Sequence, residues 1–528
     1  MGSDRYVPRR FVQPTLRFLR LEAASGILMV LAATIAVVWA NSPAGDGYFE
    51  FFDNVITIDV SAGDAIDVDA ADAVPEEHGE PAALADAGAE GHATAVLVTA
   101  TEGGEVDDAA GEVHHGPVIK IGPLEIAHLT NLSIRDWIND ALMALFFFVV
   151  GLEIKRELVV GELRDPKAAA LPAVAALGGM IVPAAIYMAF NAGTPASHGW
   201  GIPMATDIAF AVGVLAMVGS KVPVGAKLFL LALAIVDDLG AIVVIALFYT
   251  EQLFFGWLGV GIVGLVIIWV MQRVHVRATV AYAVVGSLVW VAILESGVHA
   301  TVAGVAIALL TPVKAFLSPE KFGNRADDLV ESAKLYLPDS GGVHELDHHT
   351  LERVESQMSE LQTLARESLP PLTRLEFALQ PWTSYAIVPL FALANAGVVI
   401  TADSLSSIGG DKVVLGVGLG LVLGKPLGVL GFSWLAVKAG VGRLPRGATW
   451  GHMLGAGMLA GIGFTVALFV SALSFDPGDA AADSAKIGIF VASLLAGVAG
   501  ATYLKLLPDK KALPDKGDKG DKAGAAAH

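Results

Sequence analysis

The sequence contains no cysteine among its 528 residues. Disulfide bonds, zinc–thiolate sites and thiol nucleophiles are therefore excluded. Charged residues are also scarce: they make up 16% of the chain, whereas 54% is hydrophobic, and the mean hydropathy is +0.62. A soluble domain has too little interior to hide that much apolar surface, so the composition places the chain among membrane proteins.

Basic residues are missing from one long segment. Positions 50–119 hold 17 Asp or Glu and no Lys or Arg, so the formal net charge of −19 belongs largely to this segment. It does not indicate a surface that binds cationic partners, and we expect no nucleic-acid partner. Residues 61–117 cannot bury enough apolar area to fold alone, which predicts an acidic, disordered extracytoplasmic insert. Its flanks, 55–58 and 118–121, predict two short strands that could pair as one hairpin.

Long apolar stretches recur along the rest of the chain. A helix needs about 20 apolar residues to cross a bilayer, and about 12 stretches qualify. The first follows five arginines and is too long for the apolar part of a signal peptide, so we expect a retained span. The expected spans are residues 20–40, 134–154, 168–190, 201–219, 228–250, 253–272, 278–294, 297–315, 381–400, 412–437, 450–473 and 485–506. The predicted fold class is an all-α membrane protein.

Lys and Arg gather on one side of the predicted spans. With the N-terminus in the cytoplasm, the cytoplasmic segments receive among others Lys155, Arg156, Lys221, Arg273 and Arg446. The opposite side receives few basic residues. Because cytoplasmic loops are enriched in Lys and Arg, we expect both termini in the cytoplasm, and an even number of spans satisfies this.

Two inserts and two ends divide the chain into regions. These are a basic N-terminal segment with the first span (1–60), the acidic insert (61–117), the first part of the membrane core (118–317), a cytoplasmic insert (318–370), the second part of the core (371–507) and a disordered cytoplasmic tail (508–528). Apolar residues three and four apart in the cytoplasmic insert predict an amphipathic helix along Leu351, Val354, Met358, Leu361 and Ala365. We expect it on the protein or membrane surface, with a regulatory or dimerising helix as the alternative.

Two adjacent aspartates interrupt the apolar stretch LFLLALAIVDDLGAIVVIALFY at 228–249. An ionisable side chain at the bilayer centre costs about 2.5–3.5 kcal/mol on insertion scales, so Asp237 and Asp238 are functional candidates by position alone. Mutual repulsion and poor solvation favour their protonated forms, and a small hard cation can compensate the same carboxylates instead. Competition between H+ and a cation for the same oxygens is the minimal basis of an exchanger. The alternative is a pair that a nearby base neutralises.

That base could be Lys425, which stands alone among the apolar residues of its predicted span. A lysine there can pair with one of the two aspartates, or it can extend to the membrane surface. Thr206 and Asp207 follow Pro203, which tends to break the helix, and they could compensate a positive helix end. The Gly-rich stretch at 450–473 is a second candidate for an interrupted span. Paired interrupted spans point to the binding site of a transporter.

Other ionisable residues stand near span ends. Asp140 opens the second predicted span, and Glu153, Arg156 and Glu157 close it at the cytoplasmic side. They form either an ordinary interfacial ion cluster or a charged entrance that senses pH. His299 also lies near a span end, and histidine is the residue that titrates near neutral pH. A hydrogen-bonded structural histidine is the alternative.

Motifs for other chemistry are missing from the sequence. It has no phosphate-binding Gly loop, nucleophile triad or metal motif of recognisable spacing, which argues against an ATP-driven pump. A cation channel along the same acidic path is a competing class, although adjacent buried carboxylates with a buried Lys suit exchange better than conduction. An intramembrane aspartyl protease is a third class, because Asp207 and Asp238 could face each other. A pH-gradient assay separates exchange from conduction, and peptide cleavage would identify the protease.

Several of these stretches resemble one family, the NhaA-type Na+/H+ antiporters. In family order they are WINDALMALFFFVVGLEIKREL (137–158), ATDIAFAVGVLAMVGSKVP (205–223), LFLLALAIVDDLGAIVVIALFYT (228–250), SGVHATVAG (296–304), PLFALANAG (389–397) and GKPLG (424–428). The resemblance covers nearly the whole chain outside the inserts and tails. It implies a multi-pass protein of the prokaryotic cytoplasmic membrane, built from inverted repeats, with two interrupted helices that cross at the membrane midplane.

The resemblance also implies roles for single residues. The residues that match the cation- and proton-binding site, with Na+ held at the first two, are Asp237, Asp238, Asp207 and Thr206. Lys425 matches the lysine that pairs with the first of these aspartates, and Asp140 matches an aspartate of the ion path. The residues that match positions linked to pH response are Glu153, Arg156, Glu157, Glu376 and His299.

The function expected from the resemblance is secondary active transport, and not an enzymatic reaction. Na+ and also Li+ would leave the cell in exchange for external H+, in an electrogenic and pH-regulated cycle that needs no cofactor. A protonated aspartate cannot also hold Na+, because both ligands need the same oxygens. Phe377 and Gln380 stand where the best-known member has histidines, so we expect a different pH profile. The hairpin matches an element associated with dimerisation, but the acidic insert interrupts it, which leaves a homodimer open.

Overall fold

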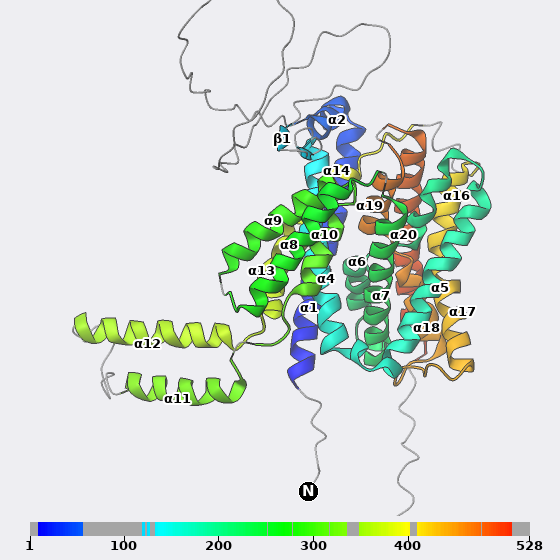
Figure 1. The fold of residues 1–528 in the computed structure, drawn as a ribbon. Helices are drawn as coiled ribbons and strands as arrows, with labels where there is room; N and C mark the ends of the chain where they lie inside the picture. Colours follow the sequence, from blue (N-terminus) through cyan, green and yellow to red (C-terminus); the bar gives the residue numbers. More distant parts are fainter. Residues whose placement is uncertain are drawn as a thin grey trace, which may run out of the picture.

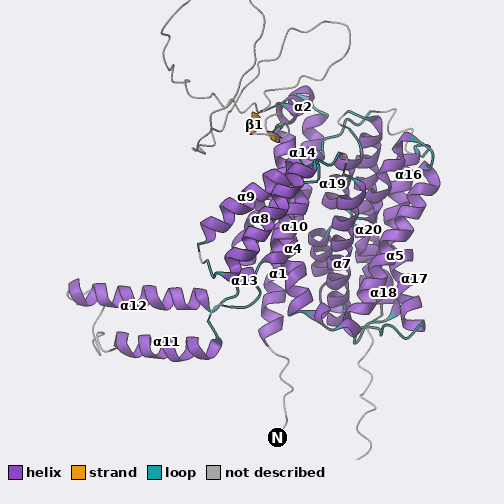
Figure 2. Ribbon diagram, viewed as in Figure 1, coloured by secondary structure: helices purple, strands orange, loops and turns teal. Residues whose placement is uncertain are grey.

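The computed structural model describes residues 9–55, 119–121, 124–126, 132–250, 252–276, 278–315, 317–334, 348–401, 409–476 and 478–508. These residues form a bundle of helices with one two-stranded sheet (Figures 1 and 2). The acidic insert at 61–117 and the tail beyond residue 508 lie outside the described residues. The predictions about those two segments therefore remain predictions.

The helices run in chain order along nearly the whole described sequence. They are α1 (Arg9–Ala40), α2 (Gly45–Asp53), α3 (Ile134–Asp136), α4 (Met143–Val159), α5 (Pro166–Asn191), α6 (Ile208–Val218), α7 (Val224–Phe248), α8 (Phe255–Arg273), α9 (Thr279–Glu295), α10 (Thr301–Leu310), α11 (Pro319–Lys334), α12 (His348–Glu367), α13 (Pro371–Trp382), α14 (Val388–Asn395), α16 (Lys412–Leu419), α17 (Lys425–Lys438), α18 (Trp450–Ala460), α19 (Phe464–Ser474) and α20 (Ala480–Leu506). A 3-10 segment, Pro195–Met204, precedes α6, and π-helical turns occupy Trp137–Leu142, Thr383–Ile387 and Gly420–Gly424.

Apolar helices overlap all of the predicted spans. Within the described residues, seven helices are long and apolar enough to cross a membrane, and the number rises to ten if each of three bent helix pairs is one span. Two shorter apolar helices, α9 and α10, lie at the remaining predicted spans. The prediction of a multi-pass helical membrane protein is therefore confirmed, whereas the number of about twelve spans stays a prediction.

The short sheet is only partly the one that the sequence predicts. Strand β1 (Ile119–Ile121) pairs antiparallel with β2 (Leu124–Ile126), so the expected strand at 118–121 is present but its partner is the segment directly after it. On the other flank, Val55 forms an isolated bridge with Ser133, and residues 56–58 lie outside the described chain. A local pairing is favoured because closing a short loop costs less entropy than closing one around the acidic insert.

Two spans are broken in the middle. The 3-10 segment Pro195–Met204 meets α6 at an angle of 41°, and α18 meets α19 at 46°. Pro203 stands just before the first break, and Gly461 and Gly463 lie in the second. Both breaks fall at the segments where the sequence predicts interrupted spans.

Glycines bring α5 and α17 into close contact beside these breaks. A Cβ atom added to Gly178 would lie 2.3 Å from the carbonyl oxygen of Gly428, and one added to Gly428 would lie 2.1 Å from the carbonyl oxygen of Gly178. Small residues permit such close helix packing within membranes. This packing sets the position of Lys425, the first residue of α17, because Gly179 lies against its side chain.

The described part of the insert at 318–370 contains two helices, where the sequence predicts one. The expected amphipathic helix is α12, and it lies beside α11, which we did not predict from the sequence. The pair projects from the bundle (Figure 1). Val354 on the predicted apolar face is buried, but Met358 on the same face is 47% exposed. An ion pair between Arg325 and Glu360 at 3.1 Å links the two helices.

Candidate functional site

Asp237 and Lys425 form a buried ion pair at the centre of the bundle. Asp237 lies in α7, and the two side chains are 3% and 1% exposed. Lys425 Nζ donates to Asp237 Oδ2 at 2.5 Å and to Thr206 Oγ1 at 2.9 Å. The Thr206 hydroxyl in turn donates to the carbonyl oxygen of Ala460 at 2.8 Å. Asp237 Oδ1 is buried and has no hydrogen-bond partner in the described part of the chain, so a cation or a proton could bind this oxygen.

Asp207 joins the two helix breaks. Its backbone N–H donates to the carbonyl oxygen of Ile462 at 2.7 Å, across the gap between the broken spans. Its Oδ1 accepts from the N–H of Phe210 at 2.9 Å, and its Oδ2 accepts from the N–H and the hydroxyl of Thr465 at 3.1 and 2.5 Å. The carboxylate therefore caps the N-termini of both α6 and α19. Helix N-termini carry partial positive charge, which stabilises a negative group at this crossing.

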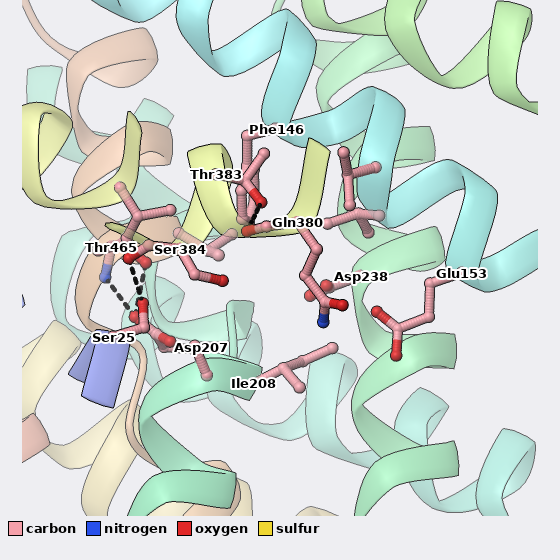
Figure 3. Close-up of a pocket in the computed structure, with 15 residues that line it drawn as sticks. Ser25, Phe146, Glu153, Asp207, Ile208, Asp238, Gln380, Thr383, Ser384 and Thr465 are labelled. Carbon is pink, nitrogen blue, oxygen red and sulfur yellow. Dashed lines mark hydrogen bonds between the residues drawn. The ribbon is translucent and has the colours of Figure 1, made fainter. Parts of the chain in front are cut away.

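Asp238 lines a cavity (Figure 3), whereas the hydrogen bond of the lysine goes to Asp237. The cavity has a volume of about 60 Å³, and its polar lining consists of Asp238, Asp207, Glu153, Gln380, Ser25, Thr383, Ser384 and Thr465. That volume holds roughly four water molecules. Adjacent residues of a helix point about 100° apart, which explains how the neighbouring aspartates face different surroundings. One is engaged by Lys425, and the other lines the cavity.

Four of the predicted pH-response residues form one cluster. Arg156 lies 3.9 Å from Glu153 Oε1 and 3.8 Å from Glu157 Oε1, and it donates a hydrogen bond to Glu376. Glu376 is buried at 3% exposure, although it comes from α13, far away in the sequence. Because Glu153 also lines the cavity, this cluster and the cavity share a residue.

Asp140 and His299 lie outside this arrangement. Asp140 is in the π-helical turn before α4, where its carbonyl oxygen accepts from the indole N–H of Trp290 at 3.1 Å. It lies roughly 20 Å along the helix from Glu153, at 1.5 Å per residue. The imidazole of His299 contacts the carbonyl oxygen of Tyr249, at the C-terminal end of α7. The cavity lining formed by the described residues includes neither side chain.

Sequence reasoning named Gln380 only as a position that affects the pH profile, and it did not name Thr465. Gln380 stands four residues after Glu376 and therefore on the same helix face, a spacing that could have pointed to it. Thr465 follows the second break, where a hydroxyl near a helix N-terminus could have drawn attention. The π-helical turn that contains Asp140 and the one that precedes Lys425 had no sequence signal, and such turns are frequent at functional sites.

The arrangement can hold either a small cation or protons. Carboxylate, amide and hydroxyl oxygens surround the cavity, and oxygen ligands suit small hard cations. The positive charge of Lys425 neutralises the negative charge of one of the two adjacent carboxylates. When both aspartates are ionised, the group of Asp237, Asp238 and Lys425 therefore carries one net negative charge, and a monovalent cation or a proton at Asp238 neutralises this group. Asp207 and Glu153 add further negative charge to the cavity when they are ionised.

Comparison with known proteins agrees with this geometry. The sequence model of the family described as Na+/H+ antiporter 1 matches residues 16–73 and 111–504, which leaves the middle of the acidic insert unmatched. The Na+/H+ antiporter NhaA of Rhodopirellula baltica is 41% identical over 491 residues, 93% of each chain. NhaA of Wolinella succinogenes is 48% identical over 378 residues, 71% of this chain and 81% of that protein. NhaA of Helicobacter pylori is 48% identical over 385 residues, 72% and 84% of the two chains.

These relatives are named as antiporters, which are transporters and not enzymes. The match extends over most of the chain and includes α7, α17 and both broken spans. The chain therefore belongs to the Na+/H+ antiporter family.

Proposed function

We propose that the protein extrudes Na+, and also Li+, in exchange for external H+. The observation that carries the proposal is that the two adjacent aspartates have different surroundings. Lys425 holds Asp237, whereas Asp238 lines a cavity with two further carboxylates. A cation that enters the cavity meets Asp238, and protonation of the same carboxylate removes the charge that holds the cation.

The exchange is electrogenic in this proposal. Asp238 can carry one proton, and the Asp237–Lys425 pair can carry another when the ion pair opens. A cycle that releases more than one proton for each Na+ moves net charge across the membrane. An imposed membrane potential then changes the rate of exchange, at about 2.3 kcal/mol for each elementary charge and 100 mV.

Regulation by pH is assigned to the cluster around Arg156. Glu153 lies between this cluster and the cavity, so a change in its charge alters the potential at the cytoplasmic entrance. Asp140 is proposed as part of the ion path on the other side, and His299 as a further pH-responsive residue. No cofactor is required besides the transported ions.

The membrane arrangement that we propose has both termini in the cytoplasm of a bacterial cell. The two breaks joined by Asp207 then lie near the middle of the membrane, and the two halves of the core form inverted repeats, the architecture of this transporter class. Association into a homodimer through the short sheet is part of the same proposal.

An Asp238→Asn variant tests the proposal in reconstituted vesicles. Loss of a buried charged partner costs about 2–5 kcal/mol, so Na+-driven proton movement is expected to fall at least 30-fold. The assay follows internal pH after Na+ addition between about pH 6 and 9, a range around the ordinary pKa of histidine near 6.5. Asp476→Asn is the control, because Asp476 is an exposed aspartate that does not line the cavity. Exchange at the unmodified rate in Asp238→Asn would sink the proposal, and Na+ current without proton movement would indicate a channel.

A further inference from the structure

Gln380 lines the same cavity as Asp238, and nothing in the proposed exchange has yet used it. It stands in the last turn of α13, one helical turn after Glu376. Its backbone carbonyl oxygen accepts from the Thr383 hydroxyl at 2.9 Å, at the start of the π-helical turn. The backbone at this position is therefore held, while the side chain extends into the cavity.

The amide of Gln380 reaches the side of the cavity where Asp238 and Glu153 lie (Figure 3). These two carboxylates come from α7 and α4, so three helices meet around the amide. Glu153 belongs to the cluster around Arg156, and Asp238 is the proposed ion ligand. A cation that moves from one carboxylate to the other thus passes the amide.

The size of the cavity makes this passage demanding for a hydrated ion. About 60 Å³ holds only a few water molecules, at roughly 15–30 Å³ for each. A cation that enters must exchange part of its water for protein oxygens. A carbonyl oxygen suits a small hard cation, and unlike an additional carboxylate it adds no charge to the site.

We propose that Gln380 is a further cation-binding residue, whose amide oxygen replaces a water of the Na+ ion between Glu153 and Asp238. This inference rests on the proposed Na+/H+ exchange. The amide has a second use in the absence of the cation, because its NH2 group can donate to either neighbouring carboxylate. Since the amide does not titrate, its contribution to Na+ binding stays the same across the working pH range.

A Gln380→Met variant tests the proposal, since Met has a similar length but offers no hard oxygen ligand. The apparent KM for Na+ is expected to rise about tenfold, equal to about 1.4 kcal/mol, with the maximal rate of exchange largely retained. The matched control is Gln362→Met, at an exposed position on α12 outside the cavity. Equilibrium binding of isotopic Na+ to the purified full-length variants checks that the change in KM reflects affinity.

The outcomes separate this proposal from the exchange itself. An unmodified protein that shows no Na+-driven proton movement would refute the proposed function, whereas active exchange with an unchanged KM in Gln380→Met would overturn the role of Gln380. If Gln380→Met does not fold, Gln380→Glu decides, because it keeps an oxygen and adds a negative charge. A KM for Na+ below that of the unmodified protein at alkaline pH supports the proposal, and an equal or higher KM overturns it.

Discussion

Helices α7 and α8 follow each other in the chain, yet they have different surroundings. The mean hydropathy of their most apolar windows is 2.5 and 2.0, but 61% of the window is buried in α7 and only 17% in α8. Helix α7 carries Asp237 and Asp238 near its middle, whereas the only ionisable residue of α8 is Arg273 in its last turn. Hydropathy shows that both can cross a membrane, and the charges show which one must lie inside the protein.

The interior of the bundle supplies polar partners for the two carboxylates of α7. Asp237 pairs with Lys425, and Asp238 lines a cavity with polar walls. The middle of helix α8 carries no charged side chain that would need a partner. Its side chains can therefore face lipid, as Val263 does at 58% exposure. The difference predicts how each helix responds when charges are removed or added.

The largest effect is expected from Lys425→Met, which removes the ion-pair partner that allows the charged side chain of Asp237 to be buried. Breaking a buried ion pair from one side costs about 3–5 kcal/mol of unfolding free energy, because the remaining charge stays buried. Denaturant unfolding in detergent micelles measures this loss.

Two variants control for the change of side chain. Lys412→Met lies on the same long span, but its side chain is exposed, so little change is expected. The double variant Asp237→Asn with Lys425→Met removes both charges and is expected to recover most of the stability. Equal stability of Lys425→Met and the unmodified protein would contradict the role given to the pair.

An intermediate effect is expected from Val263→Asp, which gives α8 a carboxylate near its middle without a partner. The cost at the bilayer centre is about 2.5–3.5 kcal/mol on insertion scales. We expect a lower yield of folded protein and a lower unfolding midpoint, measured by size-exclusion chromatography and thermal unfolding. Val263→Leu should behave like the unmodified protein. A stable Val263→Asp protein would show that α8 does not face lipid as its exposure indicates.

The smallest effect is expected from Thr206→Val, which keeps the shape of the side chain but removes its hydroxyl. Lys425 loses one of its two hydrogen-bond partners, and the carbonyl oxygen of Ala460 loses its donor from Thr206. Leaving a buried polar group unsatisfied costs about 1–3 kcal/mol. Thr206→Ser keeps the hydroxyl and should retain stability in the same denaturant assay. If both variants unfold alike, the hydroxyl does not stabilise the Asp237–Lys425 pair.

The predicted spans agree with the structure because each one is a local property of about 20 residues. The interrupted spans were also predictable, since Pro203 and a run of glycines mark the breaks. The partner of the strand at 118–121 was not, because strand pairing depends on which segment closes the shorter loop. Helix α11 was missed although its apolar residues Phe322, Ala326 and Leu329 repeat at spacings of four and three, which is the pattern of an amphipathic helix.

The sequence by itself determined that the chain is a membrane protein. It also determined that Asp237, Asp238 and Lys425 carry a high free-energy cost within their spans, which points to a function. It determined this because charge within an apolar stretch is a property of each segment alone. Only the tertiary structure decided that Lys425 holds Asp237, that Asp238 faces a cavity, and that Gln380 shares that cavity. These choices depend on helix rotation and on contacts between residues almost two hundred positions apart, which no local pattern encodes.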